Sequence, residues 1–188
     1  MQCAPGPPTS RLWSTASRAA EEYLDHESHI LRVAARDLLT VIAKIESLEI
    51  EPALLERWAQ GAAIGLQTDP TPEGRAAAAR LLAPTGGPGT ASGLAKTLLS
   101  GNFAERAAAE EALTALAQRT DGVAVARGVF PLTEPGSRRT EPVRAAALRI
   151  LGATKHRDAE EVLEQASEDG DVIVRRAANE GLERLRAK

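Results

Sequence analysis

A chain of 188 residues is long enough for one domain with its own core, or for a short array of repeats. Hydrophobic residues make up 43% and charged residues 26%, which is typical of a folded soluble protein and excludes a disordered one. Aromatic residues make up 3% and alanine about a fifth, which favours closely packed helices over a β-sandwich, and the net charge of −3 gives no general positive excess for nucleic acid or membranes.

Ten amphipathic segments follow one another along the chain as five pairs. The first segment of each pair is expected at residues 10–24, 51–66, 90–100, 121–132 and 157–167. Residues that commonly cap helices directly precede four of the second segments: Thr71 (with Pro72 after it), Asn102, Thr140 and Asp171. Each pair therefore predicts a helical hairpin, an A helix followed by a B helix, which buries its apolar face only by stacking on its neighbours.

One spacing recurs in every predicted B helix: an Arg, an Ala three residues later and a Leu four residues after that. In the fifth unit these are Arg175, Ala178 and Leu182, within an apolar stripe that includes Val174 and Leu185. The recurring arginines, called here the ladder arginines, are Arg32, Arg75, Arg106, Arg144 and Arg175. They lie 43, 31, 38 and 31 residues apart, a spacing that suits helical hairpins. The sequence therefore predicts an all-α fold, an α-solenoid of about five hairpins.

The segments "DGDVIVRRAANEGL" and "DPTPEGRAAAARLL" resemble HEAT-like repeats, in particular the short bacterial kind that is also found in phycobilisome lyases. The resemblance covers roughly residues 10–186 and is strongest in the fifth unit. Unit three departs from the pattern with Glu105 in place of Val, and unit one with His26 and Ser28 in place of the turn aspartates. The resemblance implies a superhelix with the B helices on its concave side, and binding rather than catalysis.

The ladder arginines are expected to be structural. An Arg that recurs in every unit can donate to carboxylates and carbonyl groups in the turn of the adjacent unit, and stacking requires such regularity. An anion-binding track is the alternative interpretation.

A second set of charged residues lies five positions after the ladder arginines and alternates in sign. This charge column contains Asp37, Arg80, Glu111, Arg149 and Glu180. Parallel stacked B helices place these residues near one another. We therefore expect either ion pairs between units or a mixed-charge concave surface that binds a partner protein.

The longest turn within a hairpin, residues 132–142, contains Arg138 and Arg139. Insertions on one face of a repeat array often carry binding, and stacking gives this one no role. A guanidinium group forks two hydrogen bonds to a carboxylate, so the pair indicates an acidic segment of a partner protein.

No catalytic or metal-binding motif stands out. His26 and His29 lie beside two carboxylates in "DHESH", but no third His or Cys is near, so no metal site is expected. The sequence contains no G-x-x-x-x-G-K-[ST], G-x-S-x-G or H-E-x-x-H motif, so neither an enzyme nor a cofactor is expected. With Cys3 as the only cysteine, and no visible leader or membrane span, the sequence favours a cytoplasmic protein.

The two ends of the chain suggest different roles. Residues 1–9 are expected to form a disordered tail, and residues 10–188 a single solenoid. The fifth B helix has no obvious polar capping helix after it, and solenoid ends normally need a polar outer face. We therefore expect Val172 and Ile173 to support weak self-association.

These observations favour a non-enzymatic protein-interaction module: an adaptor, an inhibitor or a regulatory subunit. One alternative is a nucleic-acid protein resembling the HEAT-like DNA glycosylases. Such proteins need a basic concave face with aromatic residues, and the composition counts against both. A chaperone of the bilin-lyase type is another alternative, and it rests on the resemblance of the repeats alone.

Overall fold

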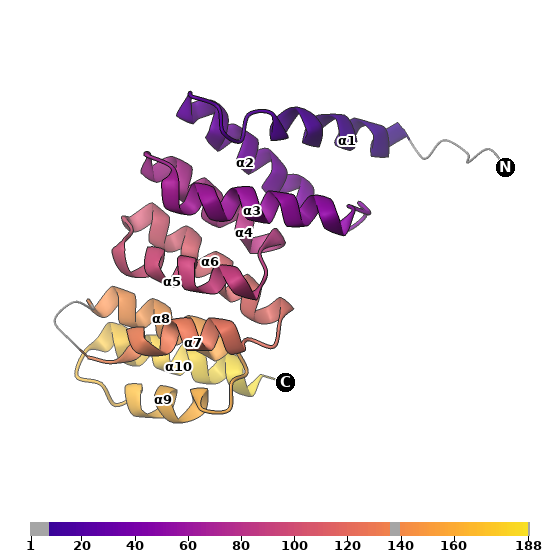
Figure 1. Ribbon diagram of the computed structural model, residues 1–188. Helices are drawn as coiled ribbons and strands as arrows, with labels where there is room; N and C mark the ends of the chain where they lie inside the picture. Colours follow the sequence, from indigo (N-terminus) through magenta and orange to yellow (C-terminus); the bar gives the residue numbers. More distant parts are fainter. Residues whose placement is uncertain (1–7, 136–139, 188) are drawn as a thin grey trace.

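The computed structural model describes residues 8–135 and 140–187, and within them the chain forms ten α-helices, one 3₁₀ helix and no strand (Figure 1). The A helices are α1 (Pro8–Glu21), α3 (Pro52–Thr68), α5 (Ala91–Ser100), α7 (Val123–Thr133) and α9 (Ala159–Ala166). The B helices are α2 (His29–Ala43), α4 (Pro72–Thr85), α6 (Phe103–Arg119), α8 (Glu141–Ala153) and α10 (Val172–Arg186), and the 3₁₀ helix η1 (Pro88–Thr90) precedes α5.

The predicted all-α solenoid of five hairpins is confirmed. Of the predicted tail at 1–9, residues 1–7 lie outside the described residues, and Pro8 and Thr9 belong to α1. Within the described ranges, no helix combines the length and the apolar character needed to cross a membrane.

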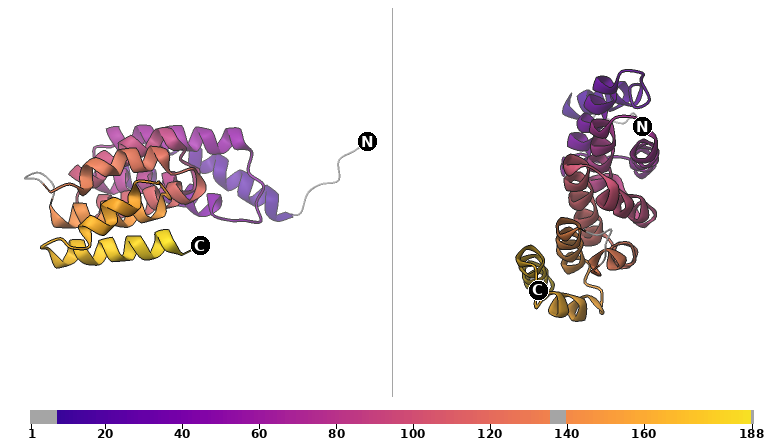
Figure 2. Two further views of the ribbon diagram at one scale, coloured as in Figure 1. Left: turned by 90° about the horizontal axis from the view of Figure 1, so that it is seen from below. Right: turned by 90° about the vertical axis from the view of Figure 1, so that its left-hand side faces the viewer.

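The B helices stack in chain order, and α3, α5 and α7 form a second layer beside them (Figures 1 and 2). Helices α6 and α8 pack less closely than the other successive B helices. The stack bends toward its B-helix side at the C-terminal end, as the right-hand view of Figure 2 shows. Side chains from units two apart also meet on the B-helix side: Lys44, which follows α2, lies 3.0 Å from Glu111 on α6. The B helices line the concave side, as the resemblance implies.

Alanine and leucine form the core, because small alanines let helices approach closely and leucines fill the space between them. Ala77, Ala78, Leu81 and Leu82 of α4 are fully buried, and similar residues of α6 and α8 continue this layer. The stack is tightest between α8 and α10, where a Cβ built on Gly152 would lie 2.4 Å from the carbonyl oxygen of Gly181. Small side chains at these crossings set the spacing of the stack.

The predicted caps begin three of the B helices with a hydrogen bond. Thr71 accepts from the amide of Gly74, and Asp171 accepts from two amides of α10. Asn102 accepts from the amide of Glu105, whose side chain accepts from the Asn102 amide in return, which makes a capping box. Thr140 stands at the N-cap of α8 without such a bond.

Candidate functional site

Two of the ladder arginines bind a carboxylate at the start of the next B helix. Arg32 donates from Nε and Nη2 to the two carboxylate oxygens of Asp69, at 2.8 and 3.0 Å. Arg75 donates from Nε to Glu105 at 2.6 Å. The Nη1 atoms of both arginines donate to carbonyl groups in the turns before their own helices. Glu105, which departs from the repeat pattern, therefore serves as the acceptor for the preceding unit.

Arg144 makes the corresponding connection between units four and five. Its Nη2 donates to Asp169 at 2.5 Å, and its Nε donates to the carbonyl oxygen of Thr133 at 3.2 Å. This hydrogen bond from Arg144 lowers the pKa of Asp169 from its ordinary value, with a smaller contribution from the amide of Asp171. Asp169 and Asp69 occupy equivalent places, six residues before the ladder arginine of their own units.

Asp69 also binds an arginine that the sequence did not single out. Nη1 of Arg36, a fully buried residue of α2, donates to Asp69 at 2.6 Å and to the carbonyl oxygen of Gly74. Burial would raise the pKa of Asp69, but hydrogen bonds from Arg32, Arg36 and Thr71 lower it far below its usual range. Gly65 makes room for Arg36, since a Cβ there would lie 2.5 Å from Nη2.

The ladder is interrupted at Arg106 and ends at Arg175. Arg106 makes no hydrogen bond or ion pair among the residues that the structure describes. In unit four, the place that holds Asp69 in unit two is taken by Arg138, which lies outside the described residues. Arg175 donates to the carbonyl oxygens of Asp169 and Gly170 in its own turn. The ladder arginines therefore do not all make the same link to an adjacent unit, contrary to the expectation from the sequence.

The first half of the charge column forms ion pairs across the concave face. Arg80 donates to both carboxylate oxygens of Asp37, at 3.0 and 3.2 Å, and so joins α4 to α2. Glu111 instead pairs with Lys44, across α4.

The residues in the second half of the charge column do not form ion pairs with their neighbours in the column. Arg149 donates to both oxygens of Glu110, at 2.6 and 3.0 Å, and not to Glu111. This hydrogen bonding raises the pKa of Arg149, to which the charge of Glu180 also contributes. Glu180 itself pairs with Arg176, one turn earlier on α10.

A shallow groove of about 440 Å³ runs along α6 on the concave side. We call it the α6 groove; its lining residues are Ala107, Glu110, Glu111, Thr114, Ala115, Gln118 and, from α10, Arg184. Two carboxylates lie on α6, and Arg184 reaches the groove from a helix two units further along. Arg184 forms no ion pair with any residue in the described ranges. Repeat spacing gives no signal for Arg184, because its position depends on the bend of the stack.

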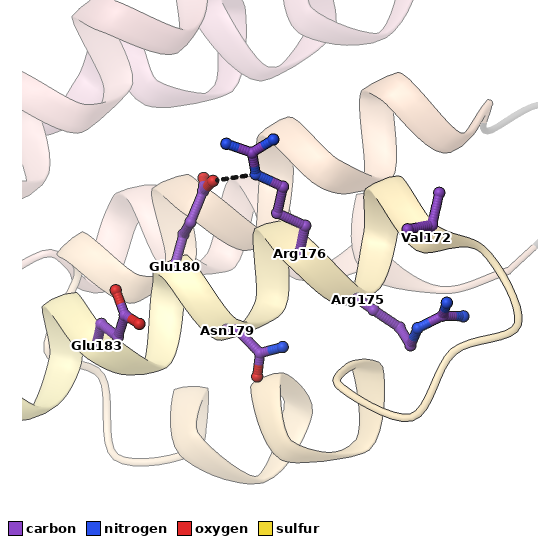
Figure 3. A pocket seen from close by; sticks show the side chains of 6 residues that line it. All are labelled: Val172, Arg175, Arg176, Asn179, Glu180 and Glu183. Atoms are coloured by element: carbon purple, nitrogen blue, oxygen red, sulfur yellow. Dashed lines mark hydrogen bonds and ion pairs between the residues drawn. The ribbon is translucent and has the colours of Figure 1, made fainter.

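A second hollow, of about 450 Å³, lies on the outer side of α10 (Figure 3). It is lined by Val172, Arg175, Arg176, Asn179, Glu180 and Glu183. Arg176 and Glu180 face each other across one turn in Figure 3, with their ion pair at 3.0 Å. Val172 and Ile173 are 65% and 49% exposed at the start of this helix. The last B helix thus carries a largely polar outer face of its own, with two apolar residues at its edge.

The remaining predicted sites are dispersed or lie outside the described residues. Arg138 and Arg139 fall in the gap at 136–139. Nδ1 of His26 accepts from the amide of Ser28, and His29 begins α2. In residues 8–135 and 140–187, no three His, Cys, Asp or Glu side chains gather in a way that could hold a metal ion.

Comparisons with known proteins point to the fold. No family model matches the chain, and no curated protein matches it. Among solved structures, an engineered protein from a structural genomics consortium has a TM-score of 0.58 and 21% identity, over 94% of this chain and 87% of that one. Human deoxyhypusine hydroxylase in complex with glycerol has a TM-score of 0.60 and 18% identity, over 95% of this chain and 66% of that one.

A second engineered protein from the same consortium has a TM-score of 0.54 and 21% identity, over 91% of this chain and 48% of that one. At such identities the likeness concerns the fold alone. It agrees with the helical-repeat architecture, and the chain has a HEAT-like helical-repeat fold.

Proposed function

We propose that this protein is a non-enzymatic interaction module that holds a segment of a partner protein against its concave face, in the α6 groove. The observation that carries the proposal is how the charged side chains of this groove are paired. Its two carboxylates are engaged by Arg149 and Lys44, whereas Arg184 has no such partner in the described part of the chain.

The chemistry of the groove suits a peptide segment. Ala107 and Ala115 are small, so a partner backbone or helix can approach α6 closely. Thr114 and Gln118 offer hydrogen bonds beside them. An acidic side chain of the partner would complete the groove by binding Arg184, because guanidinium and carboxylate groups make strong, directional hydrogen bonds.

The wider features of the chain support the same proposal. The repeats resemble the short bacterial HEAT-like kind, and solenoids of stacked repeats offer extended concave surfaces for binding. Arg138 and Arg139 in the loop at 132–142 provide a second contact for an acidic partner in this proposal. The role would be that of an adaptor, an inhibitor or a regulatory subunit in the cytoplasm.

The experiment compares charge reversals at two exposed arginines. The tagged wild-type protein, Arg184→Glu and Arg127→Glu are used as baits in cell extract, and the captured proteins are quantified by mass spectrometry. Arg127 is the matched control, since it is exposed on α7 and forms no ion pair among the described residues. We expect a partner that both wild type and Arg127→Glu enrich and that Arg184→Glu enriches at least tenfold less, about 1.4 kcal/mol of binding free energy.

Equal enrichment by all three baits would contradict a binding role for the α6 groove. A photo-activated cross-linking residue at position 115 gives an independent readout. It should cross-link the same partner, whereas the same residue at position 92, exposed on α5, should not. A titration with duplex DNA at low salt tests the nucleic-acid alternative, and we expect weak binding that salt removes.

A further inference from the structure

The first B helix exposes a row of residues that later B helices cover. The row occupies one position before the ladder arginine and two, six and nine positions after it. In α2 it consists of Leu31, Ala34, Leu38 and Val41, and we call it the leading row. Leu31, Leu38 and Val41 are 39%, 38% and 56% exposed, and Ala34 is also exposed.

The same positions face the preceding B helix in later units. The first three positions are buried in α4 (Gly74, Ala77, Leu81), in α8 (Val143, Ala146, Ile150) and in α10 (Val174, Ala177, Gly181). The direction is fixed by α10, where a Cβ on Gly181 would lie 2.9 Å from the carbonyl oxygen of Leu148 on α8. Helix α2 therefore presents the face on which a preceding B helix would pack, and this face is apolar.

The exposed face of α10, at the opposite end of the stack, does not match the apolar face of α2. The positions that face the following B helix are the ladder arginine and the residues four and eight after it. In α8 the latter two are Leu148 and Gly152, both buried, but in α10 they are Asn179 and Glu183, which line the hollow of Figure 3. Head-to-tail stacking of copies would bury these polar groups against Leu38, at a cost in free energy.

We propose that two copies of the chain associate through α2, packed antiparallel on α2 of the second copy around a two-fold axis. Leu31 of one copy then lies against Val41 of the other, and Ala34 against Leu38. Both pairs are centred on position 36, so one axis satisfies both. The small Ala34 accommodates the large Leu38, and the spacing of three, four and three residues is that of helices that interlock side by side.

The charges beside the leading row are compatible with this contact. Asp37 is bound by Arg80 and Lys44 by Glu111 within the same chain, so the contact leaves neither charge without a partner. A single helix face is smaller than the roughly 800 Å² per partner that a stable interface buries. The dimer is therefore weak and forms only at high protein concentration. The α6 groove lies on the concave side, and the association does not depend on what binds there.

The first test is sedimentation equilibrium of four proteins, from low micromolar to several hundred micromolar concentration. The wild type should rise from the mass of one chain towards that of two. Leu38→Asp should remain a monomer, while its helical circular dichroism stays unchanged because Leu38 is exposed. Ile64→Asp on α3, 60% exposed, and Ile173→Asp on α10 should both behave as the wild type.

A wild type that stays monomeric throughout would overturn the proposal, as would self-association that Leu38→Asp leaves intact. Loss of association in Ile173→Asp with retention in Leu38→Asp would place the contact at α10 instead and equally overturn it.

Disulfide trapping tests the antiparallel geometry. In a Cys3→Ser background, Ala34→Cys and Leu38→Cys are mixed and oxidised, and the linked species are identified by intact mass. The mixed disulfide should exceed both symmetrical ones, because Ala34 faces Leu38 of the second copy. A preference for the symmetrical Ala34→Cys dimer would indicate a parallel arrangement and contradict the antiparallel packing.

Discussion

Asp69 is the residue on which two side chains of the preceding unit converge. Arg32 and Arg36 both donate to its carboxylate, which is inaccessible to solvent. An amide in its place would leave two guanidinium groups beside a neutral group. Removing one member of a buried ion pair typically costs several kcal/mol, because the remaining charge stays buried without compensation.

We therefore predict that Asp69→Asn lowers the free energy of unfolding by about 3–5 kcal/mol. Urea denaturation followed by circular dichroism measures this change. Asp37→Asn is the matched control, since its pair with Arg80 is partly exposed and should contribute about 0–1 kcal/mol. Similar losses in the two variants would contradict the role assigned to Asp69.

The pH dependence follows from the same carboxylate. The pKa of Asp69 is lowered in the folded state, so its contribution is complete above the unfolded value of about 3.9 and is lost as pH falls towards the folded value. The stability difference between wild type and Asp69→Asn should narrow over this acidic range.

The sequence alone identified only some of the residues that join neighbouring units. The ladder arginines were recognisable because they recur with the repeat. Arg36 occurs in one unit alone, and nothing in its spacing distinguishes it from an exposed arginine. Arg149 pairs with Glu110 and not with the adjacent Glu111. This choice depends on how α6 and α8 cross, and the sequence does not reveal the crossing.

At the scale of the helical units, the junctions differ in how they are held. Arg144 joins units four and five through Asp169, whereas Arg106 makes no corresponding bond within the described residues. We predict that Arg144→Ala lowers the free energy of unfolding by about 1–3 kcal/mol, because buried acceptors lose their donor.

Arg106→Ala is the internal comparison for this prediction, and it should change the stability by less than about 0.5 kcal/mol. Thermal melts of both variants at equal concentration decide the matter. Equal destabilisation would mean that Arg106 has a partner equivalent to Asp169.

The helical elements themselves were predictable because each depends on local signals. Apolar periodicity, the caps at Thr71, Asn102 and Asp171, and the recurring Arg-Ala-Leu spacing located the five hairpins. The groove was not predictable, since it depends on how each crossing angle adds to the next.

At the scale of the whole molecule, the layer of B helices is packed least closely between units three and four. Helices α6 and α8 pack less closely there, and the ion pair of Arg149 with Glu110 spans the junction. We predict that Arg149→Ala speeds hydrogen exchange up to about fivefold in α8 and α10, but not in α2 and α4, because this partly exposed pair contributes up to about 1 kcal/mol.

Arg80→Ala provides the comparison on the other side of the molecule. It removes a similar pair, but the junction of α2 and α4 keeps the bonds to Asp69, so exchange there should change little. Uniformly faster exchange over all helices in either variant would indicate one cooperative unit and argue against a distinct junction at α6 and α8.

The double use of Glu105 has a consequence for the order in which the chain folds. One carboxylate closes the capping box of α6 and also receives Arg75 from α4. The first turn of α6 and its docking on unit two therefore form together, and neither gains its full stability alone. We expect units two and three to assemble early, as a nucleus onto which the neighbouring hairpins condense. Glu105→Ala would then slow refolding more than it speeds unfolding.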